Sequence, residues 1–271
     1  MATTRKELRR QVGNALGALT LGTVQTASTA TLTDPTLIDR ATTETEYVRN
    51  FCLLASGAHA GQVRRVVSFD PDSGQLTMAR EWGVPAYGDE YELHALVHPD
   101  VIHRAINSAL GACTRIARAT LSPILSGSRE YELPSIISRP SQVVNVHWGY
   151  GEEPETREWP LAWYAITPNP DLILRLRLRP VAPSAADRLI VTYIAPYLPL
   201  ETDEAECWCP AEWAVAGALV DVYAHIASRA TSEDVRRYEK LQYKAAKTFR
   251  RLSLAHAPRP ARRVQLPEEG L

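Results

Sequence analysis

The sequence predicts an α+β protein with β-rich, sandwich- or barrel-like modules built of short antiparallel strands, an amphipathic middle helix and a C-terminal helical hairpin. Three observations predict this class. Two stretches carry short runs of strand-forming residues broken by proline and glycine. A middle segment and a C-terminal segment instead repeat apolar residues at three- and four-residue steps. The C-terminal helical patterns are joined by a very short link, which favours antiparallel neighbours.

These patterns divide the chain into six parts. They are an N-terminal helix and arm (1–30), a first β-rich module (31–97), a helix (98–122), a second β-rich region (129–200), a helical hairpin (209–256) and an extended tail (257–271). In the first part, the spacing of Leu8, Val12 and Leu16 predicts a helix over residues 4–19, with its basic pairs facing solvent. Residues 20–33 are expected to form an extended arm or an edge strand.

The first β-rich module is organised around residues 56–93. Residues 62–69 and 75–79 favour two strands of a hairpin, and Asp70-Pro71-Asp72-Ser73-Gly74 supplies its turn. A third strand is expected over residues 90–93. Nothing in this stretch is typical of a reaction centre, so we interpret it as a structural module.

The middle helix is expected to begin at His98-Pro99, because proline is favoured in the first helical position. An apolar stripe of helical period then predicts that the helix runs to about Thr120, before Pro123. The second β-rich region contains four candidate strands, over residues 142–150, 161–167, 172–179 and 188–197.

The C-terminal part predicts two helices. The first, after Cys209-Pro210, has little polar surface and is expected to be buried or shared with a partner. The second starts at the cap Ser232 and runs to about Ala255. Three prolines prevent the tail from continuing this helix.

The net charge of the whole chain does not indicate nucleic-acid binding, because 30 Lys and Arg residues balance 31 Asp and Glu residues. The charge is unevenly distributed: residues 31–100 hold eleven acids and five arginines, whereas residues 229–263 hold eleven Lys and Arg and three acids. The four cysteines are too few and irregular for a disulfide framework. No signal-peptide core and no run of about 20 apolar residues is present, so no membrane contact is expected.

Three groups of residues are candidate sites of chemistry. Cys207 and Cys209 have a C-x-C spacing, which is atypical of structural zinc, so we interpret them as ordinary thiols. His94, His98 and His103 lack a metal-binding pattern and are interpreted as polar residues at a helix entry. The third group is a set of carboxylates beside tryptophans, typical either of a glycosidase cleft or of an acidic loop; we favour the loop. Its members are Glu152, Glu153, Glu155, Glu158, Trp148, Trp159 and Trp163. We predict no catalytic residue, metal or cofactor.

A basic stripe on the last helix is more specific. Its members recur at spacings of three and four residues: Arg237, Lys240, Lys244, Lys247 and Arg251. At 100° per residue they lie within about 80° of one another, beside the apolar face. Such a stripe is suited to phosphates or to an acidic protein surface, although a solvated face explains it as well. No aromatic residue is expected on that side to stack on bases.

A series of short phrases spans most of the chain: Thr31-Leu32-Thr33-Asp34, Tyr47-Val48, Ser56-Gly57, Gly61-Gln62, Arg64-Arg65-Val66, Ser68-Phe69-Asp70, Gly74-Gln75-Leu76-Thr77, Gly88-Asp89-Glu90-Tyr91-Glu92-Leu93, His98-Pro99, Ala105-Ile106-Asn107-Ser108-Ala109-Leu110, the segment 193–200, Pro210-Ala211-Glu212, and a two-helix end with Tyr238. In their order, these phrases resemble those of tailed-bacteriophage virion proteins of the neck, the head–tail connector or adaptor class.

The resemblance implies a non-enzymatic virion component, made in the host cytoplasm and located in the neck at the portal vertex. By family analogy it implies a homo-oligomer, a ring of twelve copies docked on the portal protein and contacted by a further neck or tail protein. The stripe, extended by Arg259, Arg262 and Arg263 of the tail, is then expected to line the DNA exit channel, in non-specific contact with genomic DNA, or to dock on an acidic portal surface.

Two alternatives remain open at this point. One is a tail-fibre or baseplate component, in which Trp148, Trp159 and Trp163 contact a partner or glycan. The other is a carboxylate-based glycosidase, which requires two opposed carboxylates in a cleft. The helical hairpin and basic tail favour the neck protein, because a fibre is expected to carry a coiled coil or a collagen-like repeat.

Overall fold

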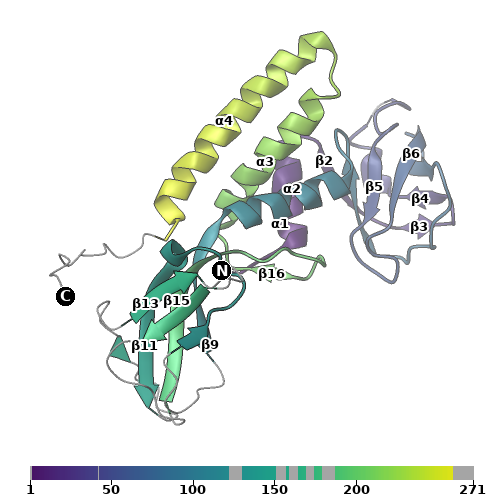
Figure 1. The fold of residues 1–271 in the computed structure, drawn as a ribbon. Coiled ribbons are helices and arrows are strands. Elements are labelled where there is room, and N and C mark those ends of the chain that lie inside the picture. The colour runs from purple at the N-terminus through teal and green to yellow at the C-terminus, as the bar shows by residue number, and fades with distance from the viewer. Residues whose placement is uncertain are drawn as a thin grey trace. The chain divides into compact units, whose positions relative to one another are not determined.

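The computed structural model describes residues 2–41, 43–121, 130–150, 157–158, 164–168, 174–178 and 187–258. The chain forms two compact units. Unit 1 comprises Met1–Cys113 and Leu198–Ala255, and unit 2 comprises Thr114–Tyr197 and His256–Leu271. Within the described residues the helices and the paired strands, all antiparallel, confirm the expected α+β class (Figure 1).

The sheet of unit 1 has seven strands in the order β2-β8-β5-β6-β7-β4-β3. Their bounds are β2 Leu19–Thr23, β3 Thr26–Ala27, β4 Thr31–Thr33, β5 Phe51–Leu54, β6 Val63–Asp70, β7 Gln75–Met78 and β8 Glu90–His94. The predicted hairpin is confirmed as β6 and β7, and Gly74 adopts φ 68° in its turn, a conformation that glycine favours. The residues expected as an arm or edge strand form β2, β3 and β4, and β2 and β3 are the two edge strands of this sheet.

A core of apolar side chains packs on this sheet, and the buried carboxylate of Asp34 lies beside it. Asp34 is 1% exposed and accepts hydrogen bonds from the Tyr91 hydroxyl (2.8 Å), the Thr36 amide (2.9 Å) and the Thr23 amide (3.2 Å). A buried carboxylate with three donors satisfies its polar atoms. It also connects β2 and β8 to the 3₁₀ turn Pro35–Leu37.

Unit 1 also contains the helices α1 (Arg5–Ala15), α2 (Pro99–Ala112), α3 (Ala211–Ala227) and α4 (Ser232–His256). α1, α2 and α3 pack against one another. At Gly217 of α3, an added Cβ atom would lie 2.7 Å from Cβ of Ala109 in α2 and 2.8 Å from a ring atom of Phe249 in α4. The missing side chain therefore lets α3 approach both neighbouring helices closely. The short strands β1 (Thr3–Thr4) and β16 (Glu206–Cys207) pair with each other.

Unit 2 contains a four-stranded sheet in the order β12-β11-β15-β9 and a three-stranded sheet in the order β10-β14-β13. The bounds are β9 Thr114–Leu121, β10 Glu130–Glu132, β11 Val143–Tyr150, β12 Arg157–Glu158, β13 Tyr164–Pro168, β14 Leu174–Leu178 and β15 Asp187–Pro196. The four strands expected between residues 142 and 197 all form, as β11, β13, β14 and β15.

The middle helix is shorter than predicted, because α2 ends at Ala112 and not near residue 122. Cys113 has an extended backbone, and β9 follows it directly. In β9 the residues Ala117 and Leu121 are buried whereas Ile116 is 53% exposed. Apolar residues in this segment fit both a helix and a strand, and pairing of β9 with β15 over its whole length selects the strand.

Candidate functional site

The surface that contains the predicted basic stripe is the outer face of α4. On its inner face, Ala245 and Leu252 are buried. The rings of Trp213 in α3 and Phe249 in α4 lie with their centroids 6.4 Å apart, and the Trp213 indole N–H donates to the Ser253 hydroxyl at 2.9 Å. These contacts fix the rotation of α4 and therefore determine which side chains face solvent.

Arg237, Lys240, Lys244, Lys247 and Arg251 are all exposed on α4, and we call these five residues the basic row. None of them forms an ion pair with a carboxylate of the described residues. At 100° per residue, the buried residues of α4 lie about 100° or more from the middle of the row. The row lies beside the apolar face without overlapping it, and its charges are available to a partner.

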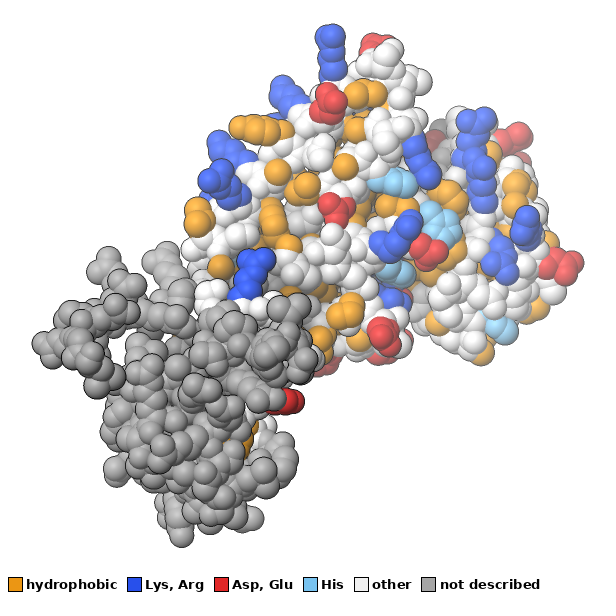
Figure 2. Space-filling model, in the orientation of Figure 1, with side chains coloured by type: hydrophobic (Ala, Val, Ile, Leu, Met, Phe, Trp, Pro, Cys, Tyr) orange, Lys and Arg blue, Asp and Glu red, His pale blue; other side chains and the backbone are white. Residues whose placement is uncertain are grey.

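Hydrophobic side chains flank the basic row. Tyr243 is 72% exposed and Leu254 is 69% exposed on the same side of α4. Figure 2 shows Lys and Arg side chains projecting along α4 with hydrophobic side chains between them. Tyr243 lies about 40° from Lys247 around the helix, so the expectation that no aromatic residue occupies this side is wrong. The guanidinium of Arg237 also lies 5.9 Å from the Tyr238 ring centroid. The face can contact apolar groups as well as anions.

The other predicted contact residues, Arg259, Arg262 and Arg263, lie outside the described residues. The same holds for Trp159, Trp163, Glu152, Glu153 and Glu155, and for the side chains of Trp148 and Glu158. The glycan-binding and glycosidase alternatives depend on these residues and stay untested predictions.

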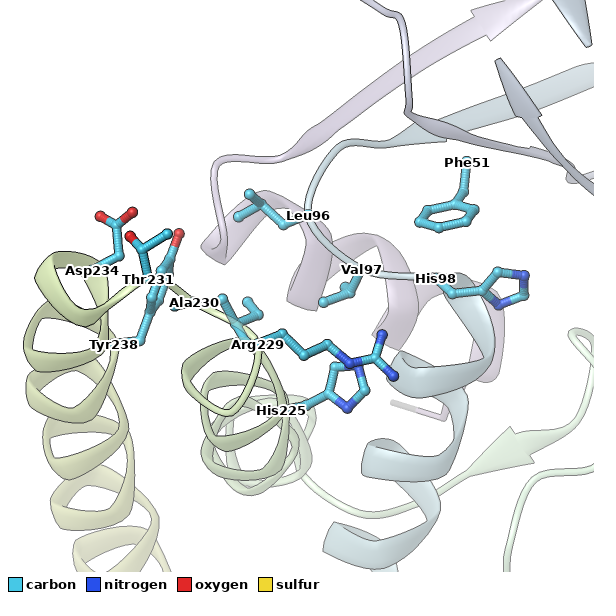
Figure 3. Close-up of a pocket in the computed structure, with 11 residues that line it drawn as sticks. Phe51, Leu96, Val97, His98, His225, Arg229, Ala230, Thr231, Asp234 and Tyr238 are labelled. Carbon is cyan, nitrogen blue, oxygen red and sulfur yellow. The ribbon is translucent and has the colours of Figure 1, made fainter. Parts of the chain in front are cut away.

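A pocket of about 360 Å³ lies where the α3–α4 link meets the segment between β8 and α2 (Figure 3). Phe51 and His98 contact edge to face, with ring centroids 4.9 Å apart, and Tyr238 contributes from α4. Figure 3 shows the side chains of His225 and Arg229 next to each other at the end of α3. Burial, and then the positive charges of Arg229 and Arg104, lower the pKa of His225. The pocket therefore combines aromatic walls with one cation, Arg229, and one carboxylate, Asp234.

The basic residues of α1 are not solvent-facing, contrary to expectation. Arg9 is 0% exposed, and its guanidinium donates to Glu92 at 2.7 Å and to Asp203 at 2.7 Å. Arg10 also donates to Glu92, at 2.8 Å. Burial alone raises the pKa of Glu92, but hydrogen bonds from His94 and Arg9, together with the Arg9 charge, outweigh it and hold the pKa well below its usual range.

The three histidines singled out in the sequence have separate roles. His94 lies 3.1 Å from the Glu92 carboxylate, and His98 caps α2 by accepting from the Asp100 amide. Nε2 of His103 accepts from Arg9 at 2.9 Å, because a guanidinium can only donate. Burial and the charges of Arg9 and Arg5 lower the pKa of His103 to about 4. No group of three or more metal-ligating side chains occurs in the described part of the chain.

The four cysteines are buried free thiols. Cys113 and Cys209 share a hydrogen bond, and the Cys209 amide donates to the Cys207 sulfur at 3.2 Å. The sequence reasoning missed this cluster, as it missed the pocket, because residues far apart in the chain make both. The only sequence signal for the pocket is weak: its segments, such as Val97-His98 and Ile226, mix apolar and polar residues.

No helix in the described ranges is both long enough and apolar enough to span a bilayer.

Comparisons with known proteins give little further information. No family model matches this chain, and no curated protein matches it. Among solved structures, the chain is similar to a chain from the neck of an empty GTA (gene transfer agent) particle computed with C6 symmetry. The match covers 46% of this chain and 63% of that chain, less than two thirds of its length, with 15% sequence identity and a TM-score of 0.25. A TM-score this low does not establish a shared fold.

Proposed function

We propose that this chain is a structural protein of a phage-like virion, a neck adaptor that forms a ring between portal and tail around the path of the DNA. The observation that carries the proposal is the basic row of α4: five exposed cations without carboxylate partners in the described residues. The order of sequence phrases that resemble neck proteins supports the same role.

The basic row fits contact with phosphates better than sequence-specific recognition. Five cations spread from residue 237 to residue 251 span about 21 Å of helix. Such a row matches the charge of a polyanion, and side chains of this kind carry no base-reading geometry by themselves. The phosphates of DNA and an acidic face of the portal are both negatively charged, so the row can bind either of them.

The test is an image of the native particle combined with a variant. Density for this chain as a ring below the portal is the expected result, and density at fibre tips contradicts the proposal. In particles that carry Arg237→Gln, Lys240→Gln, Lys244→Gln and Lys247→Gln together, we expect ring docking or retention of the packaged genome to fail. Normal particles from this variant would remove the role assigned to the basic row.

The two targets of the row are distinguished by the stage at which the variant fails. If the row faces DNA, rings are present in purified particles and the genome leaks. If the row faces the portal, rings are missing from the particles. Arg65→Gln with Arg80→Gln, which removes two exposed arginines of the first β-rich module, is the matched control and is expected to change neither result.

A further inference from the structure

Unit 1 carries an exposed aromatic side chain in an acidic setting. Trp208 is 73% exposed and lies three residues before the start of α3 at Ala211. Glu204 and Glu206 near it are also exposed, and neither forms an ion pair with the described residues. Neighbouring Asp203 is in contrast occupied by Arg5 and Arg9. A large exposed indole with unpaired carboxylates has the features of an anchor residue in a protein interface.

The pocket at the α3–α4 link has the complementary composition. Its walls include Phe51 and Tyr238. Arg229 at the end of α3 is exposed and cationic, and Asp234 in the first turn of α4 is an exposed acid on the other side of the pocket. A volume of about 360 Å³ lies within the range of sites that enclose small organic groups. An indole that enters it can stack on aromatic rings and contact a guanidinium over its face. Glu204 and Glu206, which lie beside the indole in the sequence, can then pair with the guanidinium of Arg229 at the edge of the pocket.

The two surfaces lie at opposite ends of one helix. Trp208 precedes the first residue of α3, and Arg229 follows its last turn. The helix between them has 17 residues and is about 25 Å long, so one copy cannot fill its own pocket. Two complementary patches at different places on one molecule produce head-to-tail contacts, which close into a ring when the rotation between copies permits.

We propose that a second copy of this chain is the occupant: Trp208 of one copy enters the α3–α4 pocket of the next, and its Glu204 and Glu206 face Arg229. The inference deepens the proposed ring and rests on that proposed function for its setting. It adds the two surfaces that copies use and the direction in which they join.

The test uses the full chain in solution and two variants that each lose one surface. Trp208→Ala removes the anchor and leaves the pocket, whereas Arg229→Glu replaces the guanidinium of the pocket by a carboxylate and leaves the anchor. In sedimentation velocity, we expect the wild type to self-associate and each variant alone to lose at least about thirty-fold in association constant. An equal mixture of the variants restores one good contact and is expected to form two-chain complexes and nothing larger.

Controls separate a lost contact from a lost fold. Tyr87→Ala removes an even more exposed aromatic, at 82%, whose neighbouring carboxylate Asp89 is occupied by the Ala86 amide. This variant is expected to associate like the wild type. Unfolding midpoints of all variants should match the wild type, and Glu206→Lys added to Arg229→Glu should recover association.

Three results overturn the inference: a wild type that stays a single chain up to about 1 mM, a Trp208→Ala chain that associates normally, or a mixture that forms no two-chain complex. Failure of the neck role is distinguishable, because it is measured by location in the particle. A chain found in the neck whose Trp208→Ala variant still forms rings keeps the proposed function and loses this contact.

Discussion

Helices α1 and α4 both carry clustered arginines and lysines, and the two clusters have opposite environments. Arg9 of α1 is fully buried between Glu92 and Asp203, whereas Arg237 of α4 is exposed and without a carboxylate partner in the described residues. The difference comes from what each helix packs against. α1 meets a strand that brings an acidic side chain to the interior, and α4 packs through Trp213, Phe249 and Ser253. Basic residues are structural in the first helix and available for binding in the second.

The largest expected effect is on stability at α1. Arg9→Met leaves the buried Glu92 with Arg10 and His94 but without its most buried partner, and it also removes a partner of Asp203. Breaking a buried ion pair from one side costs about 3–5 kcal/mol, so we expect a loss of this size in the free energy of unfolding. Arg237→Met in α4 is the matched control, expected within about 0.5 kcal/mol of the wild type in urea unfolding. Equal losses would remove the contrast between the helices.

A pH series tests the same network at His103. Its pKa is about 4 in the folded protein and about 6.5 when unfolded, so the unfolded chain binds more protons between these values. Stability should therefore fall by about 2–3 kcal/mol as the pH drops from 7 to 4. His103→Gln cannot titrate, and this part of the slope should disappear from its unfolding curves. The pKa of Glu92 is held below its usual range, so its contribution starts to be lost as the pH falls below the pKa of the unfolded carboxyl, at the acidic end of the series.

A smaller effect is expected where α4 packs on α3. Ser253→Ala removes the acceptor of the Trp213 indole N–H, and Trp213 is 1% exposed. The loss of one hydrogen bond to a buried donor costs about 1–2 kcal/mol in the free energy of unfolding. Chemical denaturation measures it, and Ser232→Thr, a conservative change at the exposed first residue of α4, serves as the neutral control. No loss in Ser253→Ala would mean that α4 is held by its apolar contacts alone.

The smallest effect on stability, within about 0.5 kcal/mol, is expected when Arg237, Lys240, Lys244 and Lys247 are all changed to Gln. Binding is expected to change instead. If the row contacts DNA, the slope of log affinity against log salt concentration should become shallower by about 3–4, because each lost phosphate contact contributes about 0.9. Fluorescence anisotropy with duplex DNA measures the slope. An unchanged slope would assign the row to a protein partner or to solvent.

Local patterns in the sequence predict the strands and helices well where one template fits. The hairpin of β6 and β7 follows from its Asp-Pro and Gly turn residues, and α4 from its apolar period. The segment after Cys113 fits two templates, and its pairing with β15 decides between them. The environment of Arg9 depends on Glu92 and Asp203, which lie 83 and 194 residues away, so no local pattern predicts it. No local pattern predicts the pocket either, because its residues are far apart in the sequence. The basic row, in contrast, can be predicted from the period of one helix.

The connection between α2 and α3 has an evolutionary consequence. The chain leaves unit 1 after Cys113 and returns at Leu198. The strands at this crossing, β9 and β15, are antiparallel neighbours with Thr114 opposite Pro196, so their Cα atoms lie about 5 Å apart. The segment between Cys113 and Leu198 thus leaves and re-enters unit 1 at neighbouring points, as a tight loop would. Recombination can exchange or shorten this insertion without changing the spacing between α2 and α3, and we expect related chains to differ most in its size.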